Sequence, residues 1–248
     1  MARFVLVHGA FSGGWIWDSL IESLEELGHR GEAFDLPGLG EDRTPARDVT
    51  LDAYAARLCE VLATSREPAI VVGSSMGGVV AKQGAARCPE RVAALVYAAA
   101  FNPRDGQSLL DLTKLPEGAG DQVQANLTVS GDPPVGVMSA AASRQALYEC
   151  CTDDVAADAI ARQQPQPVAP FVMPVSLPAG VLDRIPQYAV VCTRDRAIPP
   201  VLQRRMSKEN ACADVVDIDT DHTPQLSRPK ELAEALDRFA KHVARGLR

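Results

Sequence analysis

A serine between two glycines is the residue of this sequence best suited to nucleophilic chemistry. Ser75 lies in the stretch Gly73-Ser-Ser-Met-Gly77, which follows an apolar β-branched run at 70–72 and leads into small residues at 79–87. A strand, a tight turn and a helix form the context in which Gly-x-Ser-x-Gly becomes a nucleophile elbow, with the serine hydroxyl exposed at the top of a sheet. The pattern alone also fits an ordinary glycine-rich turn, so the assignment depends on the partners of Ser75.

A serine hydroxyl needs a base within hydrogen-bond reach, and the sequence holds four histidines. His222 follows the last predicted strand, at the sheet edge where Ser75 is expected, and we predict that it is the base. His8 ends the first strand, where a structural or oxyanion-loop role fits better. His29 is predicted to lie on the surface, and His242 near the end of the last helix, where a cation interacts favourably with the helix dipole.

A carboxylate should hold the imidazole in one tautomer and stabilise its protonated form. Asp195 comes just after the strand that precedes the strand of His222, so its side chain is expected at the same crevice. Asp219 and Asp221 are nearer in sequence, but close neighbours in an extended loop point away from His222. Asp183 precedes its strand and is expected at the opposite edge. The sequence therefore favours Asp195.

Two backbone N–H groups are expected to bind the oxyanion that develops during acyl transfer. Met76 follows the serine and opens a helix, where the helix dipole favours negative charge. Ala10 follows the first strand, and Gly9 allows the backbone there to turn inward; the alternative is a glycine-rich connection without a role. The side chains expected to line a substrate pocket are Phe11, Ser74 and Phe101.

Strands and helices alternate along most of the chain. The predicted strands are 3–8, 31–34, 70–72, 92–98, 187–192 and 215–218. Their residues are apolar throughout and do not alternate between apolar and polar, which is typical of a parallel sheet covered by helices on both faces. The sequence therefore predicts an α/β fold.

The regular pattern stops between residues 103 and 185. Prolines and glycines are frequent there, and two helices are predicted at 143–151 and 153–164. We interpret 103–185 as a cap (lid) inserted into a core domain formed by 1–102 and 186–248. Tyr148 is the single aromatic residue between Phe101 and Phe171, so the sequence predicts an aliphatic pocket rather than one that stacks aryl groups.

Composition limits the classes of partner and the compartment. The 248 residues are 46% hydrophobic and carry a net charge of −7, which argues against nucleic acid and anionic membranes as partners. No apolar run reaches the roughly 18 residues of a membrane-spanning helix, and the N-terminal residues lack the features of a signal peptide. The six cysteines show no metal-ligand spacing. We therefore expect free thiols, no metal site and a cytoplasmic protein.

Several stretches read together carry a family resemblance. They are Val5-Leu-Val-His-Gly-Ala10, Gly13-Gly14-Trp15, Asp35-Leu36, Gly73-Ser-Ser-Met-Gly-Gly78, Cys192-Thr-Arg-Asp195 with Ile198-Pro199, and Asp221-His222. The sequence resembles the α/β-hydrolase superfamily, and within it the branch of plant methyl esterases and hydroxynitrile lyases with their bacterial carboxylesterase relatives. The resemblance implies a core of about six parallel strands with a small helical cap, no cofactor and a possible homodimer. It places the triad on Ser75, Asp195 and His222, and the oxyanion donors on Ala10 and Met76.

The sequence departs from this branch at four positions. The lyases carry a threonine in the oxyanion loop and a lysine after the catalytic histidine, where this chain has Gly9 and Thr223, so cyanohydrin cleavage is disfavoured. Ser74 replaces the common histidine or glutamate, and Ser12 replaces a frequent second histidine.

These residues together predict a serine hydrolase that cleaves a small methyl or short-alkyl carboxylic ester through an acyl-enzyme. A serine rather than an aspartate at position 75 argues against haloalkane dehalogenase and epoxide hydrolase chemistry. Two alternatives stay open. One is a lactone or C–C bond hydrolase with the same triad, and the other is a non-enzymatic ligand receptor on a hydrolase scaffold.

Overall fold

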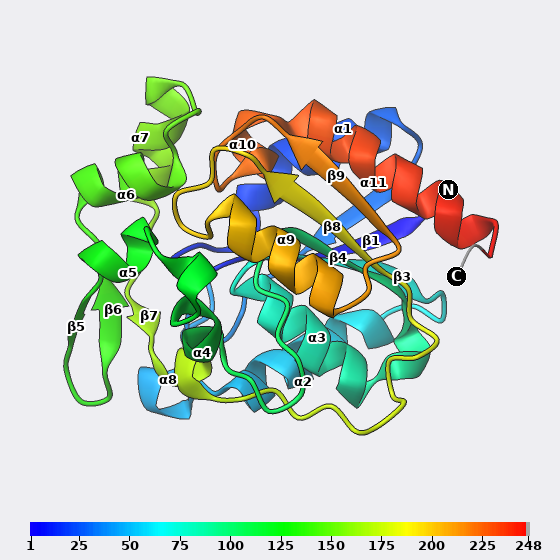
Figure 1. Ribbon diagram of the computed structural model, residues 1–248, viewed down its shortest axis with the longest axis horizontal. Coiled ribbons are helices and arrows are strands. Elements are labelled where there is room, and N and C mark those ends of the chain that lie inside the picture. Colours follow the sequence, from blue (N-terminus) through cyan, green and yellow to red (C-terminus); the bar gives the residue numbers. More distant parts are fainter. Residues whose placement is uncertain (247–248) are drawn as a thin grey trace.

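Six parallel strands form the centre of the molecule (Figure 1). They are β1 (Arg3–Val7), β2 (Arg30–Ala33), β3 (Ala69–Ser75), β4 (Val92–Ala100), β8 (Gln187–Cys192) and β9 (Asp214–Ile218). Their spatial order is β2-β1-β3-β4-β8-β9, and every neighbouring pair is parallel. The computed structural model describes residues 1–246. The predicted parallel sheet is confirmed, with strand ends within a few residues of the expected ones.

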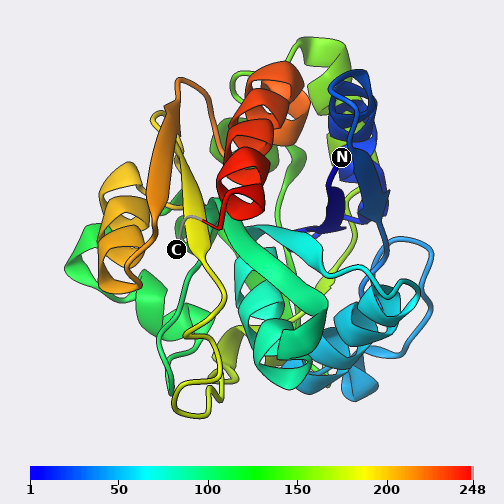
Figure 2. The same ribbon diagram turned by 90° about the vertical axis from the view of Figure 1, so that its right-hand side faces the viewer.

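Helices cover both faces of this sheet (Figure 2). One face carries α2 (Leu51–Ala63), α3 (Gly77–Arg87) and α9 (Pro200–Glu209), and the other carries α1 (Asp18–Glu26) and α11 (Pro229–Ala244). In β1, Val5 and Val7 belong to the first core, whereas Phe4 and Leu6 belong to the second. Because both sides of each central strand are buried, the strands are apolar throughout.

The order of the strands creates a crevice at the carboxyl edge of the sheet. β1 lies between β2 and β3. The connection after β1 therefore runs to β2 at one edge of the sheet, and the connection after β3 runs in the opposite direction, to β4. The loops after two such strands diverge, and ligands of open α/β sheets bind between them. Ser75 ends β3, and Gly9 and Ala10 follow β1. The topology therefore brings the two predicted parts of the site together.

Residues 109–172 lie beside the carboxyl ends of the strands, at the left of Figure 1, and residues 173–185 then run along the bottom of the view to the start of β8. Their elements are α4 (Leu109–Thr113), α5 (Gln122–Asn126), β5 (Thr128–Ser130), β6 (Val135–Val137), α6 (Ala140–Leu147), α7 (Asp153–Ala161), β7 (Gln166–Pro167) and α8 (Ala169–Val172). The helices predicted at 143–151 and 153–164 correspond to α6 and α7, which are shorter. The small antiparallel sheet β5-β6-β7 was not predicted, because its strands are too short for a period-two pattern.

The remaining elements are short. They are α10 (Pro224–Ser227) and the 3₁₀ turns Gly14–Trp17, Ala46–Asp48, Pro89–Arg91 and Pro116–Gly118. None of the helices within residues 1–246 has the length and apolar character needed to cross a bilayer.

Two expectations about single side chains are wrong. Cys59 of α2 and Cys88 at the end of α3 form a disulfide, although all thiols were expected to be free. The two helices pack side by side, and a pair 29 residues apart leaves no local spacing signal. His29 is not a surface residue: its side chain is 8% exposed, packs edge-on against Phe4 and lies 3.1 Å from Asp237.

Candidate active site

Ser75 stands at a strained turn between β3 and α3. Its φ angle is +56°, in the left-handed region that non-glycine residues seldom adopt. A Cβ atom at Gly73 would lie 2.5 Å from the Gly77 carbonyl oxygen, and one at Gly77 would lie 2.4 Å from the Val7 oxygen. Both glycines are therefore required for the close approach of the turn to β1 and α3, as the motif predicts.

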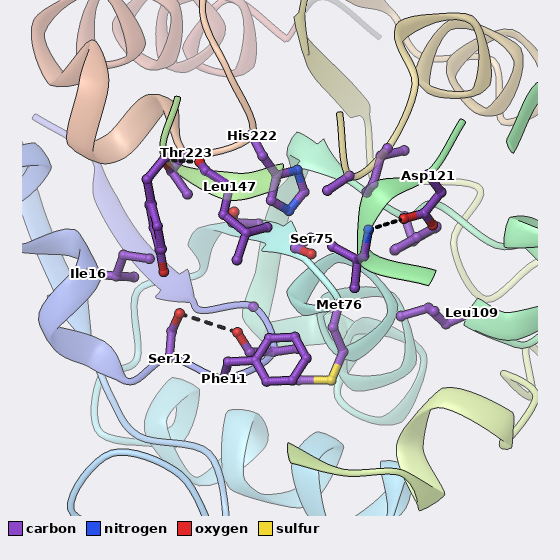
Figure 3. A pocket seen from close by; sticks show the side chains of 18 of the residues that line it. Phe11, Ser12, Ile16, Ser75, Met76, Leu109, Asp121, Leu147, His222 and Thr223 are labelled. Carbon is purple, nitrogen blue, oxygen red and sulfur yellow. Dashed lines mark hydrogen bonds between the residues drawn. The ribbon is translucent and has the colours of Figure 1, made fainter. Parts of the chain in front are cut away.

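His222 and Asp195 form a buried pair next to this turn. His222 lies in the loop between β9 and α10, and Asp195 follows β8. His222 Nδ1 is 2.8 Å from Asp195 Oδ2, and the two side chains are 4% and 0% exposed. In Figure 3 the ring of His222 points toward Ser75. Ser75 and His222 thus line one cavity, and Asp195 lies behind His222, in contact with its Nδ1.

Four hydrogen bonds hold the Asp195 carboxylate. Oδ1 accepts from the backbone N–H groups of Ala197 (2.8 Å) and Ile198 (2.9 Å), and Oδ2 accepts from His222 and from Gln203 Nε2 (2.8 Å). Gln203 is fixed in turn, because its Oε1 accepts from the Cys192 N–H at 3.2 Å. No sequence pattern points to Gln203, since a glutamine on a helix carries no local signal that reveals its partner.

The electrostatic surroundings of His222 favour its protonated form. Burial by itself lowers the pKa of His222, but the negative charges of Asp195, Asp221 and Asp121 and the hydrogen bond to Asp195 outweigh it, so the pKa is raised above its usual value. A carboxylate close to an imidazole stabilises the positive charge that appears when the ring takes a proton. The ring is therefore suited to accept a proton from a neighbouring hydroxyl.

The carboxylates that were ranked lower lie elsewhere. Asp219 is exposed and pairs with Arg194 at 3.1 Å, and Asp183 is exposed in the loop before β8. Asp221 is buried, but its Oδ2 accepts from the Cys150 N–H (2.6 Å) and its Oδ1 from the Thr223 N–H (3.1 Å). Asp221 therefore ties the His222 loop to residues 103–185 rather than orienting the imidazole directly.

His8 is a buried structural residue under the loop after β1. Its Nδ1 lies 2.8 Å from the Gly9 carbonyl oxygen, and its Nε2 accepts from the Leu36 N–H at 3.1 Å. Burial lowers the pKa of His8 to about 4, against smaller opposing effects of Gly9 and Asp35. The ring is thus neutral near pH 7, and both its nitrogens are already occupied, which leaves none to serve as a base.

The two predicted oxyanion donors have free N–H groups beside Ser75. Neither Ala10 nor Met76 donates a backbone hydrogen bond to another group within residues 1–246. A Cβ atom at Gly9 would lie 2.8 Å from the Ser75 Cβ, so only glycine lets this loop approach the serine. Phe11, two residues after Gly9, donates a 3.3 Å hydrogen bond from its N–H to Gln166 Oε1.

A largely apolar pocket surrounds these groups (Figure 3). Besides Ser75, Met76 and His222, its lining includes Gly9, Ala10, Phe11, Ser12, Ile16, Ser74, Phe101, Leu109, Asp121, Val123, Gln124, Leu147, Tyr148, Phe171, Ala197, Ile198, Thr223 and Gln225. Phe11, Ser74 and Phe101, the residues proposed from sequence for the pocket, are among these lining residues. The prediction of an aliphatic lining is wrong, because Phe11, Phe101, Tyr148 and Phe171 all contribute rings from segments distant in sequence.

Two polar side chains of the pocket were missed. Gln225 is 1% exposed, and its Oε1 has no hydrogen-bond partner among residues 1–246. Asp121 caps α5: its Oδ1 accepts from the N–H groups of Val123 (2.8 Å) and Gln124 (3.0 Å). An aspartate before a short helix can be recognised as a cap, but no local pattern shows that it faces a pocket.

Within the described part of the chain no cluster of three or more His, Cys, Asp or Glu side chains is arranged to hold a metal ion.

Comparison with known proteins shows the same architecture. The model of the Alpha/beta hydrolase family matches residues 4–235. Methylesterase 7 of Arabidopsis thaliana is 30% identical over 255 residues, which cover 98% of this chain and 97% of the relative. Alpha-hydroxynitrile lyase of the same plant is 31% identical over 249 residues, 96% of each chain. A pyrethroid hydrolase from Sphingobium faniae JZ-2 has a similar structure, with a TM-score of 0.87, 25% identity and coverage of 98% and 99%.

Proposed function

The chain belongs to the alpha/beta hydrolase family, and from this membership we propose that it is a serine hydrolase of small methyl or short-alkyl carboxylic esters. The observation that carries the proposal is the buried 2.8 Å contact between His222 and Asp195 in the pocket of the strained Ser75. A nucleophile, a base and a group that orients the base are the requirements of covalent acyl transfer.

The reaction follows from the positions of these groups. Ser75 Oγ attacks the ester carbonyl carbon while His222 Nε2 takes its proton. Asp195 accepts the hydrogen bond of Nδ1–H and stabilises the imidazolium. The N–H groups of Ala10 and Met76 bind the tetrahedral oxyanion, with the N-terminus of α3 adding a favourable dipole. His222 then protonates the leaving alcohol, and water activated by the same ring hydrolyses the acyl-enzyme.

One observation at the site favours ester hydrolysis over cyanohydrin cleavage. Thr223, the residue after His222, uses its hydroxyl to donate to the Leu147 carbonyl oxygen at 2.8 Å, so no cation stands at this position. A relative named as a methylesterase and one named as a hydroxynitrile lyase match this chain at 30% and 31% identity, so sequence identity does not choose between the two reactions. The apolar lining supports a substrate whose ester carries a small apolar group.

A substrate panel tests the proposal. Short methyl esters, lactones and β-diketones are compared by kcat/KM with the wild-type protein and Ser75→Ala. We expect multiple turnovers and the highest kcat/KM with methyl esters, and no turnover above background with Ser75→Ala. A preference for lactones or β-diketones would move the assignment to those reactions. Ligand binding without turnover of any panel member would instead indicate a receptor.

A further inference from the structure

The pocket contains one carboxylate that the proposed reaction does not use. Asp121 lies in the loop before α5, within the segment 103–185 that covers the carboxyl end of the sheet. In Figure 3 it is on the same side of the cavity as Leu109, with Ser75 between it and Thr223. Its distance in sequence from the residues of the proposed triad explains why no motif identifies it.

Only one oxygen of Asp121 is occupied by the protein. Oδ1 accepts the two N–H groups that cap α5, from Val123 and Gln124. Oδ2 makes no hydrogen bond with any residue from 1 to 246, although the whole residue is only 8% exposed. Oδ2 is not one of the side-chain atoms that are both closed off from water and without a partner, so it stays accessible and free to accept a hydrogen bond from a ligand.

No permanently charged cation of the described lining residues stands beside the Asp121 carboxylate. The titratable groups that face Asp121 are Asp195 and His222, and no lysine or arginine from the described chain lines the pocket. Burial raises the pKa of Asp121 to about 6, and the nearby charge of Asp195 acts in the same direction, against the cap hydrogen bonds and His222. At pH 7.5 the side chain is therefore mostly ionised, in a pocket where, among the described lining residues, His222 is the one side chain that can carry a positive charge.

We propose that Asp121 determines substrate specificity by pairing its free oxygen with an ammonium group of the substrate, at the side of the pocket formed by Leu109 and Val123. This inference rests on the proposed function only in treating the ligand as an ester. The pocket then prefers cationic esters over neutral esters of the same shape and rejects anionic ones. An ammonium group supplies both the hydrogen-bond donor and the opposite charge that Asp121 lacks.

Binding of simple probes tests the proposal without any chemical reaction. Dissociation constants of hexylammonium, hexan-1-ol and hexanoate are measured at pH 7.5 with the wild-type protein and Asp121→Asn. The amide oxygen of asparagine still caps α5, so the fold is retained while the charge is lost. We expect hexylammonium to bind the wild type most tightly and hexanoate least, and Asp121→Asn to weaken hexylammonium by about tenfold to hundredfold with little effect on the alcohol.

A matched control separates the local effect from the change in net charge. Asp111→Asn removes a carboxylate that belongs to the capping box of α4 and does not line the pocket. It should leave all three dissociation constants unchanged. Equal selectivity for hexylammonium over hexan-1-ol in the wild type and Asp121→Asn would overturn the proposal, and would leave Asp121 with only its helix-capping role.

Two further readouts connect binding to turnover. Methyl 6-aminohexanoate and methyl heptanoate have the same shape, and their kcat/KM ratio should fall by about tenfold or more in Asp121→Asn. The binding preference for hexylammonium should also grow as pH rises through about 6 in the wild type, and the growth should be smaller in Asp121→Asn, where only the loss of the His222 charge contributes.

The outcomes distinguish this inference from the proposed function. If hexylammonium is selected through Asp121 but no ester is hydrolysed, the proposed function fails and the binding role of Asp121 stands. If esters are hydrolysed without any dependence of the amine preference on Asp121, the specificity proposal fails alone.

Discussion

His222 Nδ1 lies 2.8 Å from Asp195 Oδ2, and both side chains are closed off from solvent. Because Nδ1–H is directed at the carboxylate, the lone pair of Nε2 is left on the side of the ring that faces Ser75. The Asp195 carboxylate is itself fixed by Gln203 and by two backbone N–H groups. The orientation of the imidazole is thus set by contacts that extend from β8 to α9.

Removal of either reacting group should abolish most of the activity. Ser75→Ala deletes the nucleophile and His222→Ala deletes its base, and each should lower kcat by roughly 10⁴- to 10⁶-fold. Initial rates on a short-chain ester measure the effect. Ser130→Ala is a suitable control, because Ser130 is an exposed residue at the end of β5 outside the pocket. A Ser75→Ala protein within tenfold of the control would contradict the assigned role.

The contact between Gln203 and Asp195 should matter for catalysis although Gln203 touches no substrate. Gln203→Glu would put a second carboxylate 2.8 Å from Asp195 in place of a donor. We expect kcat to fall by about tenfold to hundredfold, as for other groups that orient a catalytic side chain, and the loss to deepen as pH rises and the new carboxyl ionises. The neighbouring Arg204→Gln, which alters an exposed ion pair with Asp217, should have little effect. Equal kcat values for the two variants would disprove a positioning role.

The charge of Asp221 should be visible in the pH profile. Ester hydrolysis requires neutral His222, so kcat/KM falls as pH drops through the pKa of this histidine in the free enzyme. Asp221 is one of the charges that raise that pKa. Asp221→Asn should therefore move the acid limb of the profile to lower pH. As a control, Asp219→Asn changes an exposed carboxylate in the same loop and should leave the acid limb of the profile in place. An acid limb that is unchanged or moved to higher pH in Asp221→Asn would refute the electrostatic explanation.

His8 should make the protein sensitive to mild acid. The pKa of His8 is lowered from 6.5 to about 4 in the fold, so between these pH values the unfolded chain binds a proton that the folded chain does not. Stability should then fall as pH decreases from about 6.5 to 4, by about 3 kcal/mol for this residue. Urea unfolding of the wild type and His8→Gln at several pH values measures this contribution. The variant should show a shallower pH dependence, and identical slopes would exclude His8 as the cause.

Much of the architecture was accessible from sequence because its determinants are local. Ile70, Val71 and Val72 form a short β-branched run, and Gly73 and Gly77 meet a steric requirement within a single turn. The alternation of such runs with helical segments then fixes the parallel sheet, and the sheet places the ends of β3, β8 and β9 at one edge. The positions of Asp195 and His222 follow from that edge.

Other features depend on contacts that no local pattern encodes. The rings of Phe11 and Phe171 line one pocket although 160 residues separate them, so the aromatic lining could not be read from the cap alone. The Cys59–Cys88 disulfide and the burial of His29 likewise result from the packing of whole helices. Asp121 was missed for the same reason, since its cap role is local but its exposure to the pocket is not.

The most direct test of the proposed mechanism identifies the nucleophilic residue by covalent labelling. The protein is treated with a fluorophosphonate, and the modified peptide is located by mass spectrometry while ester hydrolysis is followed in parallel. We predict one adduct per chain, on Ser75, with activity lost in proportion to labelling and no adduct in Ser75→Ala. An adduct on another residue that abolishes activity, or full hydrolysis by a protein completely labelled on Ser75, would contradict the proposed mechanism.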